Sequence, residues 1–251
     1  MSNGNSIRKR ALNARVGGVR IPISVYETGP NDRELVLIIY GGSTTMSFGQ
    51  RKCWRMKKRF AEAGFSAASF DFRGSIPGTE YFKAGLCTRL EDARAALDRL
   101  KREYPTRPIT ILGVSMGGYL ATFFANEPVV KRLILIAPAA YHKDAMAKKL
   151  LFGPAFSALI RTPESWKQSD SFDNVLTFHG SMLVIRFGED EVVPQEIPAL
   201  YYAWSDSPYG ETRTLIDIVG YGHKGNWDGP KFKEIMDVVI PWLKERTKTV
   251  S

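Results

Sequence analysis

Short apolar runs recur along the chain and alternate with longer segments whose apolar residues have helical spacing. Most of these runs are nearly continuous, which is typical of central strands covered on both faces of a parallel sheet. They predict six strands, at residues 35–40, 65–70, 109–114, 132–136, 182–187 and 214–219.

Two earlier segments, around residues 12–16 and 20–26, alternate between polar and apolar positions. A period of two predicts half-buried strands, and the Gly17-Gly18 pair between them favours a tight hairpin turn. We therefore expect an antiparallel hairpin at the edge of the sheet, which brings the expected number of strands to eight.

The segments between the strands predict helices. The clearest is residues 86–103, where Leu90, Ala93 and Leu97 recur at helical spacing. In residues 51–63 the apolar positions share one face and most of the cations the other. Strands separated by helices predict an α/β fold with a mostly parallel sheet and right-handed crossovers. Three further helices are predicted at residues 118–126, 194–204 and 231–245.

Residues 141–180 interrupt this alternation, because they contain no good strand and are rich in Ala, Phe, Lys and Ser. We expect a small helical insertion there, between the sixth and seventh strands. The rest of the chain, residues 1–140 and 181–251, then forms the α/β core.

The composition is that of an ordinary globular protein, with 251 residues, 44% of them hydrophobic and 24% charged. It excludes a disordered or collagen-like chain. No apolar run is long enough for a membrane helix, and the N-terminal segment lacks the apolar stretch of a secretory signal. Two cysteines, Cys53 and Cys87, exclude a disulfide scaffold, so we expect a cytoplasmic protein.

The net charge of +9 is concentrated in two segments, residues 1–20 and 51–62, each with a net charge of +5. The remainder is close to neutral, which argues against a dedicated nucleic-acid-binding protein. Solvated surface is the simpler explanation for both segments, and weak binding of an anionic partner is the alternative. The oligomeric state does not follow from the sequence.

Residues 113–117 read Gly-Val-Ser-Met-Gly, a G-x-S-x-G pattern with Ser115 at its centre. An apolar strand precedes the pattern and a helix-forming segment follows it. This is the context in which a serine hydroxyl is exposed at a sharp strand-to-helix turn, where small flanking residues are needed. Ser115 is therefore the candidate nucleophile.

Four motifs follow one another along the chain: the pattern around Ser115 is joined by Asp71-Phe-Arg-Gly74, Gly188-Glu-Asp-Glu-Val-Val-Pro194 and Gly220-Tyr-Gly-His223. With these motifs in this order the chain resembles the α/β-hydrolase superfamily, in particular its smaller intracellular serine hydrolases of esterase, acylglycerol-lipase and peptidase type. The resemblance implies an eight-stranded, mostly parallel sheet with helices on both faces.

A serine nucleophile needs a base and an acid that orients this base. His223 follows an apolar strand and matches the base of the family, whereas His142 and His179 lie in or beside the insertion. Counted back from Pro194, Asp190 occupies the position of the acid; counted forward from Gly188, Glu191 does. We favour Asp190, which gives the order Ser, Asp, His expected of this fold.

The resemblance places an oxyanion hole at the backbone N–H groups of Gly42 and Met116. Tyr40 stands where the family often has His. Asp71, Arg73 and Gly74 are interpreted as loop structure, through an Arg–Asp or backbone contact. No cofactor and no metal are expected, because neither a nucleotide-binding motif nor a His/Cys/Asp cluster with ligand spacing occurs.

The insertion at residues 141–180 lies where the family carries its lid. Phe152, Phe156 and Trp166 are candidates for an apolar substrate pocket, with packing of the insertion onto the core as the equal alternative. Because the insertion has only about 40 residues, we expect a modest pocket rather than a deep lipid tunnel.

The sequence thus predicts a carboxylesterase-like serine hydrolase that cleaves a small to medium ester through an acyl-enzyme intermediate. A thioesterase, an amidase or peptidase, and a C–C bond hydrolase would use the same three residues, and the fold does not decide among them. A non-catalytic, ligand-binding member of the fold is the alternative from a different class of protein.

Overall fold

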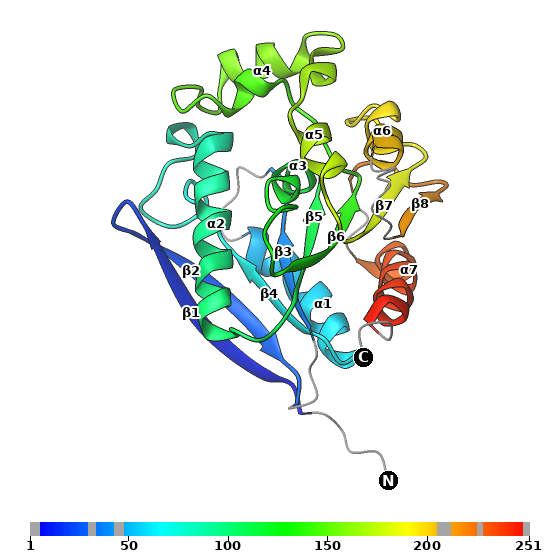
Figure 1. Cartoon of the computed structure of the whole chain (residues 1–251). Helices are drawn as coiled ribbons and strands as arrows, with labels where there is room; N and C mark the ends of the chain where they lie inside the picture. Colours follow the sequence, from blue (N-terminus) through cyan, green and yellow to red (C-terminus); the bar gives the residue numbers. More distant parts are fainter. Residues whose placement is uncertain (1–5, 30–33, 43–47, 205–211, 225–227, 248–251) are drawn as a thin grey trace.

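The computed structural model describes residues 6–29, 34–42, 48–204, 212–224 and 228–247 (Figure 1). Within them, one eight-stranded sheet has the order β1-β2-β4-β3-β5-β6-β7-β8. Only the pairs β1–β2 and β2–β4 are antiparallel. The expected mostly parallel sheet is confirmed. Its strands are β1 (Arg8–Val16), β2 (Val19–Glu27), β3 (Leu35–Ile39), β4 (Ser66–Phe70), β5 (Ile109–Val114), β6 (Val130–Ile136), β7 (Ser181–Phe187) and β8 (Arg213–Ile218).

The N-terminal hairpin lies at the edge of the sheet, as the alternating pattern predicts. Val16 pairs with Val19, so Gly17 and Gly18 form a two-residue turn. Their φ angles of 55° and 81° require glycine or a similarly tolerant residue at both positions. The turn gives the strands their register.

Helices cover both faces of the sheet, and the strands alternate their side chains between two apolar clusters. In β3, Leu35 and Leu37 belong to the cluster beneath α2 and α3, whereas Val36 and Ile38 belong to the cluster beneath α1 and α7. Both faces are therefore buried, which explains the continuous apolar runs. The helices are α1 (Phe48–Glu62), α2 (Leu86–Glu103), α3 (Met116–Thr122), α6 (Glu196–Trp204) and α7 (Gly229–Thr247), with a short helix η1 (Tyr81–Lys83).

Between β6 and β7 lie four short helical elements: η2 (Lys143–Met146), α4 (Pro154–Arg161), η3 (Ser165–Gln168) and α5 (Ser171–Leu176). In Figure 1 α4 lies beyond the end of the sheet at which α3 begins. The Tyr119 hydroxyl in α3 donates a hydrogen bond of 3.1 Å to Asp170. The Ser171 and Tyr201 hydroxyls lie 2.7 Å apart, which joins α5 to α6. The insertion is thus fastened to the core at its C-terminal end.

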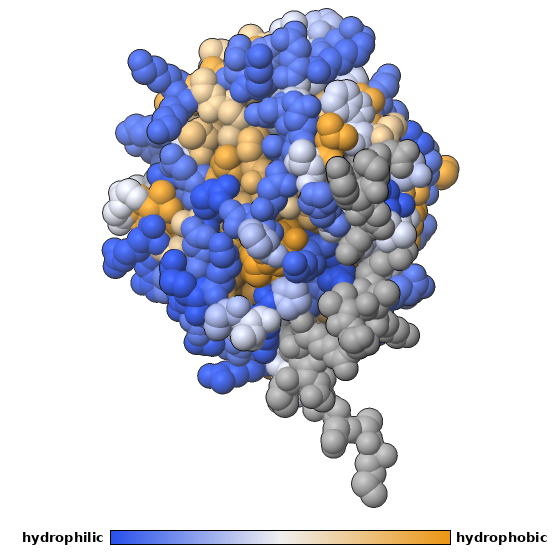
Figure 2. Space-filling model, in the orientation of Figure 1, coloured by the Kyte–Doolittle hydropathy of each residue, from blue (hydrophilic) through white to orange (hydrophobic). Residues whose placement is uncertain are grey.

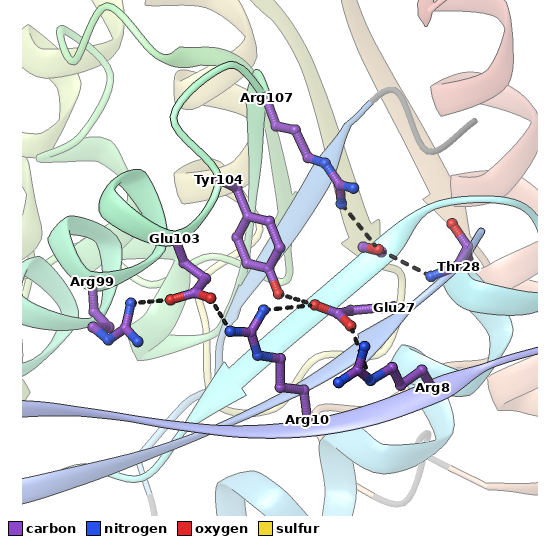
Figure 3. A network of polar contacts seen from close by, with 9 residues as sticks. Arg8, Arg10, Glu27, Thr28, Arg99, Glu103, Tyr104 and Arg107 are labelled. Atoms are coloured by element: carbon purple, nitrogen blue, oxygen red, sulfur yellow. Dashed lines mark hydrogen bonds and ion pairs between the residues drawn. The ribbon is translucent and has the colours of Figure 1, made fainter. Parts of the chain in front are cut away.

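The N-terminal basic segment is tied to α2 by a network of charged groups (Figure 3). Glu27 of β2 accepts hydrogen bonds from Arg10 and from the Tyr104 hydroxyl. Arg10 also pairs with Glu103, which Arg99 contacts from within α2. Two cations of the hairpin, Arg8 and Arg10, therefore have negative partners.

The second basic segment departs from its expected form at one position. Lys57 in α1 is only 1% exposed, whereas the pattern placed most cations of this helix on the solvent face. Its Nζ donates a hydrogen bond of 3.3 Å to the Ser24 carbonyl and lies over the ring of Tyr26. The aliphatic stem of lysine packs well among apolar residues, which a count of charges along a helix does not reveal.

No helix among the described residues is both long and apolar enough to cross a membrane.

Candidate active site

Ser115 stands at the sharp turn between β5 and α3, with φ 53° and ψ −120°. Such a conformation is rare for a residue other than glycine and holds the side chain clear of the helix. A Cβ atom on Gly117 would lie 1.9 Å from the Ile39 carbonyl oxygen, and one on Gly113 would lie 2.4 Å from that of Gly117. The turn therefore requires both glycines that flank the serine.

The structure brings Ser115, His223 and Asp190 together from three separate loops. His223 Nε2 lies 2.9 Å from Ser115 Oγ, and His223 Nδ1 lies 2.7 Å from Asp190 Oδ2. The serine follows β5, the aspartate β7 and the histidine β8. Since these strands are parallel, their carboxyl ends meet at one edge of the sheet, where ligands bind in open α/β folds.

The carboxylate of Asp190 is held from both sides. Its side chain is 3% exposed. Its Oδ1 accepts hydrogen bonds of 2.9 and 2.8 Å from the backbone N–H groups of Val192 and Val193. Burial by itself raises the pKa of Asp190, but the hydrogen bonds from His223, Val193 and Val192 outweigh it and lower the pKa below its ordinary value. The group is therefore ionised at neutral pH.

Glu191, the other candidate for the acid, contacts the same histidine in a different way. Its Oε2 accepts a hydrogen bond of 2.8 Å from the backbone N–H of His223. This bond is the main reason why the pKa of Glu191 is lowered. The imidazole thus has Asp190 as its partner, and Glu191 binds the main chain behind it.

Gly42 and Met116, the two residues named for the oxyanion hole, are neighbours across the site. A Cβ atom on Gly42 would lie 3.0 Å from Met116 Cε, and one on Gly41 would lie 3.1 Å from Ser115 Cβ. Glycine at both positions lets the loop after β3 approach the serine closely. Tyr40 is buried in the apolar cluster beneath α1 and α7.

The loop after β4 has the structural role that we expected. Arg73 makes the predicted Arg–Asp contact, but its partner is Asp92 of α2, which the sequence did not single out. Both Nε and the backbone N–H of Arg73 donate hydrogen bonds to the Asp92 carboxylate, of 2.6 and 2.7 Å respectively. Gly74 has φ 85°, and its N–H donates to the Thr79 hydroxyl. These contacts fix the loop beside the sheet edge.

The aromatic residues of the insertion pack against the core. Phe152 is buried and stacks on Tyr81 with 4.9 Å between ring centroids. Phe156 is buried too, and its ring meets that of Phe152 edge to face. Trp166 is half-buried, with Phe172 as its neighbour. Packing accounts for all of these positions, and contact of Phe152, Phe156 or Trp166 with a substrate stays a prediction.

Arg89 is a buried cation whose burial was not predicted from the sequence. Its guanidinium lies over the rings of Phe72 and Phe152, at 4.4 and 5.4 Å, and is 1% exposed. Within the part of the chain that the structure describes, Nε and Nη2 of Arg89 have no hydrogen-bond partner. The sequence did contain an indication that Arg89 is buried, because position 89 lies on the same helix face as the apolar Ala93 and Leu97. Arg89 thus joins the start of α2 to the insertion.

The two other histidines lie in other parts of the fold. His142 Nε2 lies 2.9 Å from Gln168 Oε1, and His142 Nδ1 accepts the Asp144 N–H, so its partners belong to the insertion. His179 lies in the segment between α5 and β7, before the strand that Asp190 follows. Among the described residues, no three or more His, Cys, Asp or Glu side chains gather into a group that could hold a metal ion.

Comparison with known proteins places this geometry in a family. The model of the family described as serine aminopeptidase, S33, matches residues 31–197, more than half of the chain. A monoacylglycerol lipase of Mycolicibacterium smegmatis is 27% identical over 151 residues, 59% of this chain and 52% of the relative. The aligned part thus spans about half the length of this curated relative.

Solved structures share the fold at low sequence identity. An acylaminoacyl peptidase of Pyrococcus horikoshii has a TM-score of 0.72 at 14% identity, over 96% of this chain but only 42% of its own. A carboxyl esterase of Bacillus coagulans, solved in complex with glycerol, has a TM-score of 0.72 at 14% identity, over 96% of this chain and 99% of its own. Est1E of Butyrivibrio proteoclasticus, solved with ferulic acid, has a TM-score of 0.72 at 18% identity, over 95% of this chain and 100% of its own.

The expected resemblance is therefore confirmed at the level of the family. The sheet order, the turn at Ser115 and the match over residues 31–197 agree with one another. The chain belongs to the serine aminopeptidase S33 family of α/β-hydrolases.

Proposed function

We propose that this hydrolase cleaves carboxylic esters of small to medium size, with Ser115 as nucleophile, His223 as base and Asp190 as the acid that orients the base. The observation that carries the proposal is the unbroken chain of contacts from Asp190 Oδ2 through the imidazole to Ser115 Oγ, at 2.7 and 2.9 Å. The 2.9 Å contact lies within the reach that proton transfer from the serine requires, and the 2.7 Å contact orients the imidazole.

In the first step Ser115 Oγ attacks the carbonyl carbon of the ester while its proton passes to His223 Nε2. The proton on Nδ1 stays hydrogen-bonded to Asp190, whose negative charge stabilises the imidazolium that forms. The negative charge on the carbonyl oxygen is stabilised by the backbone N–H groups of Gly42 and Met116. The imidazolium then gives its proton to the leaving alcohol, and the acyl group remains on Ser115.

In the second step water attacks the acyl-enzyme. His223 takes a proton from the water as Asp190 again holds the ring, and the second tetrahedral intermediate uses the same two N–H groups. Collapse of this intermediate returns the proton to Ser115 Oγ and releases the carboxylic acid. Removing one oxyanion donor of this kind lowers kcat by about 100- to 1,000-fold in other hydrolases.

The comparisons support an ester as the substrate, and the small insertion supports a modest size. The relative from Mycolicibacterium smegmatis is a monoacylglycerol lipase, and two of the similar structures are esterases or bind ferulic acid. Because the insertion has only four short helical elements, we expect a modest pocket. Figure 2 shows apolar residues gathered between α4 and the upper part of α2, which suits an apolar acyl or alkyl group.

A substrate panel tests the proposal. Purified protein is assayed on p-nitrophenyl esters of increasing acyl length, with a thioester and an anilide of the preferred acyl group. Turnover of short or medium esters is expected to be fastest, and Ser115→Ala is expected to lose it while the circular dichroism spectrum is unchanged. Wild-type esterase activity in Ser115→Ala would overturn the assignment. An optimum at long acyl chains, or faster cleavage of the thioester or anilide, would overturn the substrate class.

A fluorophosphonate probe distinguishes catalysis from mere ligand binding. A catalytic member of the family becomes covalently labelled at its activated serine, and the label is lost in Ser115→Ala. A folded protein that is not labelled at all would favour the non-catalytic alternative.

A further inference from the structure

The loop that carries His223 is anchored to the loop that carries Asp190 by a second carboxylate. From this arrangement we propose that Glu191 is a positioning residue, which holds the main chain of His223 so that the imidazole meets Ser115. The inference rests on the proposed function, because it assigns a task within the same site. Its contact is the hydrogen bond of 2.8 Å from the His223 N–H to Glu191 Oε2.

The pairing of β7 with β8 continues beyond the ends of both strands. The last residue pair is Phe187 with Ile218. After it, the Gly188 N–H donates to the Ile218 carbonyl over 3.0 Å, and the Glu189 N–H donates to the Tyr221 carbonyl over 2.9 Å. Further along the same two loops, the His223 N–H donates to the Glu191 side chain. The Glu191 carboxylate thus accepts a hydrogen bond that a backbone carbonyl would accept if the β7–β8 pairing continued.

The segment that leads to His223 contains two glycines, Gly220 with φ 77° and Gly222, which give the main chain freedom on both sides of the buried Tyr221. An anchor directly at residue 223 therefore limits how far the imidazole can move. The imidazole of His223 must keep two hydrogen bonds at once, and an error of about 1 Å in such a site costs about 100-fold in rate. Earlier in the segment, Lys231 donates to the Gly220 carbonyl over 3.1 Å and the Tyr221 hydroxyl donates to Glu234 over 2.5 Å, but neither contact holds residue 223 itself.

Gly222 makes room for the Glu191 carboxylate. A Cβ atom at position 222 would lie 2.9 Å from Glu191 Oε2 and 3.4 Å from the Glu189 carbonyl oxygen. The first distance is too short for an unbonded pair, so an alanine there would push the end of the Glu191 side chain away. The hydrogen bond from the His223 N–H lowers the pKa of Glu191, which keeps this acceptor ionised at neutral pH.

Substitutions in the acidic loop test the role. Glu191→Ala is expected to lower kcat for the preferred ester about tenfold with KM within about twofold of wild type, since one charge-assisted hydrogen bond is lost. Glu191→Gln retains an acceptor oxygen and is expected to recover most of kcat. Glu189→Ala is the matched control, because it removes a neighbouring exposed acid whose side chain has no contact with His223, and it should behave as wild type.

A double-mutant cycle separates positioning from general stability. Gly222→Ala is expected to lower kcat as Glu191→Ala does, and the double variant should lose little more than either single one. All rates, including that of fluorophosphonate labelling, are measured well below each melting temperature. Equal kcat in Glu191→Ala and Glu189→Ala would overturn the inference, as would full additivity in the cycle. Activity in Ser115→Ala would instead overturn the proposed function.

Discussion

Arg73 holds the buried carboxylate of Asp92 with two donors, its side-chain Nε and its own backbone N–H. Asp92 lies on the inner face of α2 with no exposed surface. Burial raises its pKa to about 6, although the ion pair with Arg73 opposes this rise. The pair fixes the loop after β4, and its contribution to the free energy of unfolding is expected to depend on pH.

Arg73→Met is expected to destabilise the fold by about 3–5 kcal/mol at pH 7.5, because a charge stays buried without its cation. Without Arg73 the pKa of Asp92 rises further, whereas an unfolded aspartate titrates near pH 4. The folded variant therefore binds more protons in this range, and its deficit shrinks as the pH falls to 5.5. Urea unfolding at both pH values measures the change. When Asp92→Asn is present in both proteins compared, the loss in free energy of unfolding caused by Arg73→Met should no longer depend on pH. If Arg73→Met alone lowered the free energy of unfolding equally at both pH values, this explanation would be wrong.

Lys57 gives a second dependence on pH, of opposite sign. Burial lowers its pKa to about 8, so the folded protein releases this proton at lower pH than the unfolded chain does. Stability contributed by this group therefore rises between about pH 8 and 10.5, by up to about 3 kcal/mol. Lys57→Met is expected to lack this rise relative to wild type. The exposed Lys58→Met variant serves as control and should follow the wild-type curve.

Asp190→Asn is expected to lower kcat by about 1,000- to 10,000-fold with the fold intact, because the amide cannot stabilise the imidazolium and favours the wrong tautomer. Asn retains an oxygen that can accept from Val192 and Val193, so the loop keeps its form. Glu191 binds the backbone of His223 and is not placed to substitute. Residual activity equal to that of wild type would show that Asp190 is not the acid. Steady-state kinetics at pH 8 measure the effect.

Gly117→Ala is expected to destabilise the protein by more than about 3 kcal/mol or to prevent folding, because its Cβ would lie 1.9 Å from the Ile39 carbonyl oxygen. Gly153→Ala is the matched substitution, since nothing lies within 4 Å of a Cβ there and its φ of 163° is extended backbone. That variant should melt within a few degrees of wild type. Thermal unfolding of both proteins compares the two positions.

The strands and the residues of the site could be predicted because their signals are local. Six apolar runs and two segments of alternating polar and apolar residues predicted the eight strands, with ends that agree within a few residues. Helix α3 begins earlier than expected, at Met116, because the turn at Ser115 leads straight into it, and it ends at Thr122. Beyond Thr122 the chain continues with tighter turns, such as the bond from the Ala125 N–H to the Thr122 carbonyl.

The contacts that the sequence did not reveal join residues far apart in the chain. Arg89 looks like a surface cation until Phe72 and Phe152 are seen around it. The burial of Asp92 is explained by its contact with Arg73, and the burial of Lys57 by its hydrogen bond to the Ser24 carbonyl. A pattern along one helix shows which face is apolar, but it does not show that a charged side chain can be accepted within this face when another element provides a partner.

The strand order gives the basic N-terminal segment a further consequence. β1 forms one outer edge of the sheet, where unpaired N–H and C=O groups would accept a strand from another molecule. This strand carries Arg8, Lys9, Arg10 and Arg15. Arg8 and Arg10 have Glu27 as their partner. A second copy that added to this edge would also bring its Lys9 and Arg15 towards those of the first copy, and we expect this repulsion to disfavour edge-to-edge association.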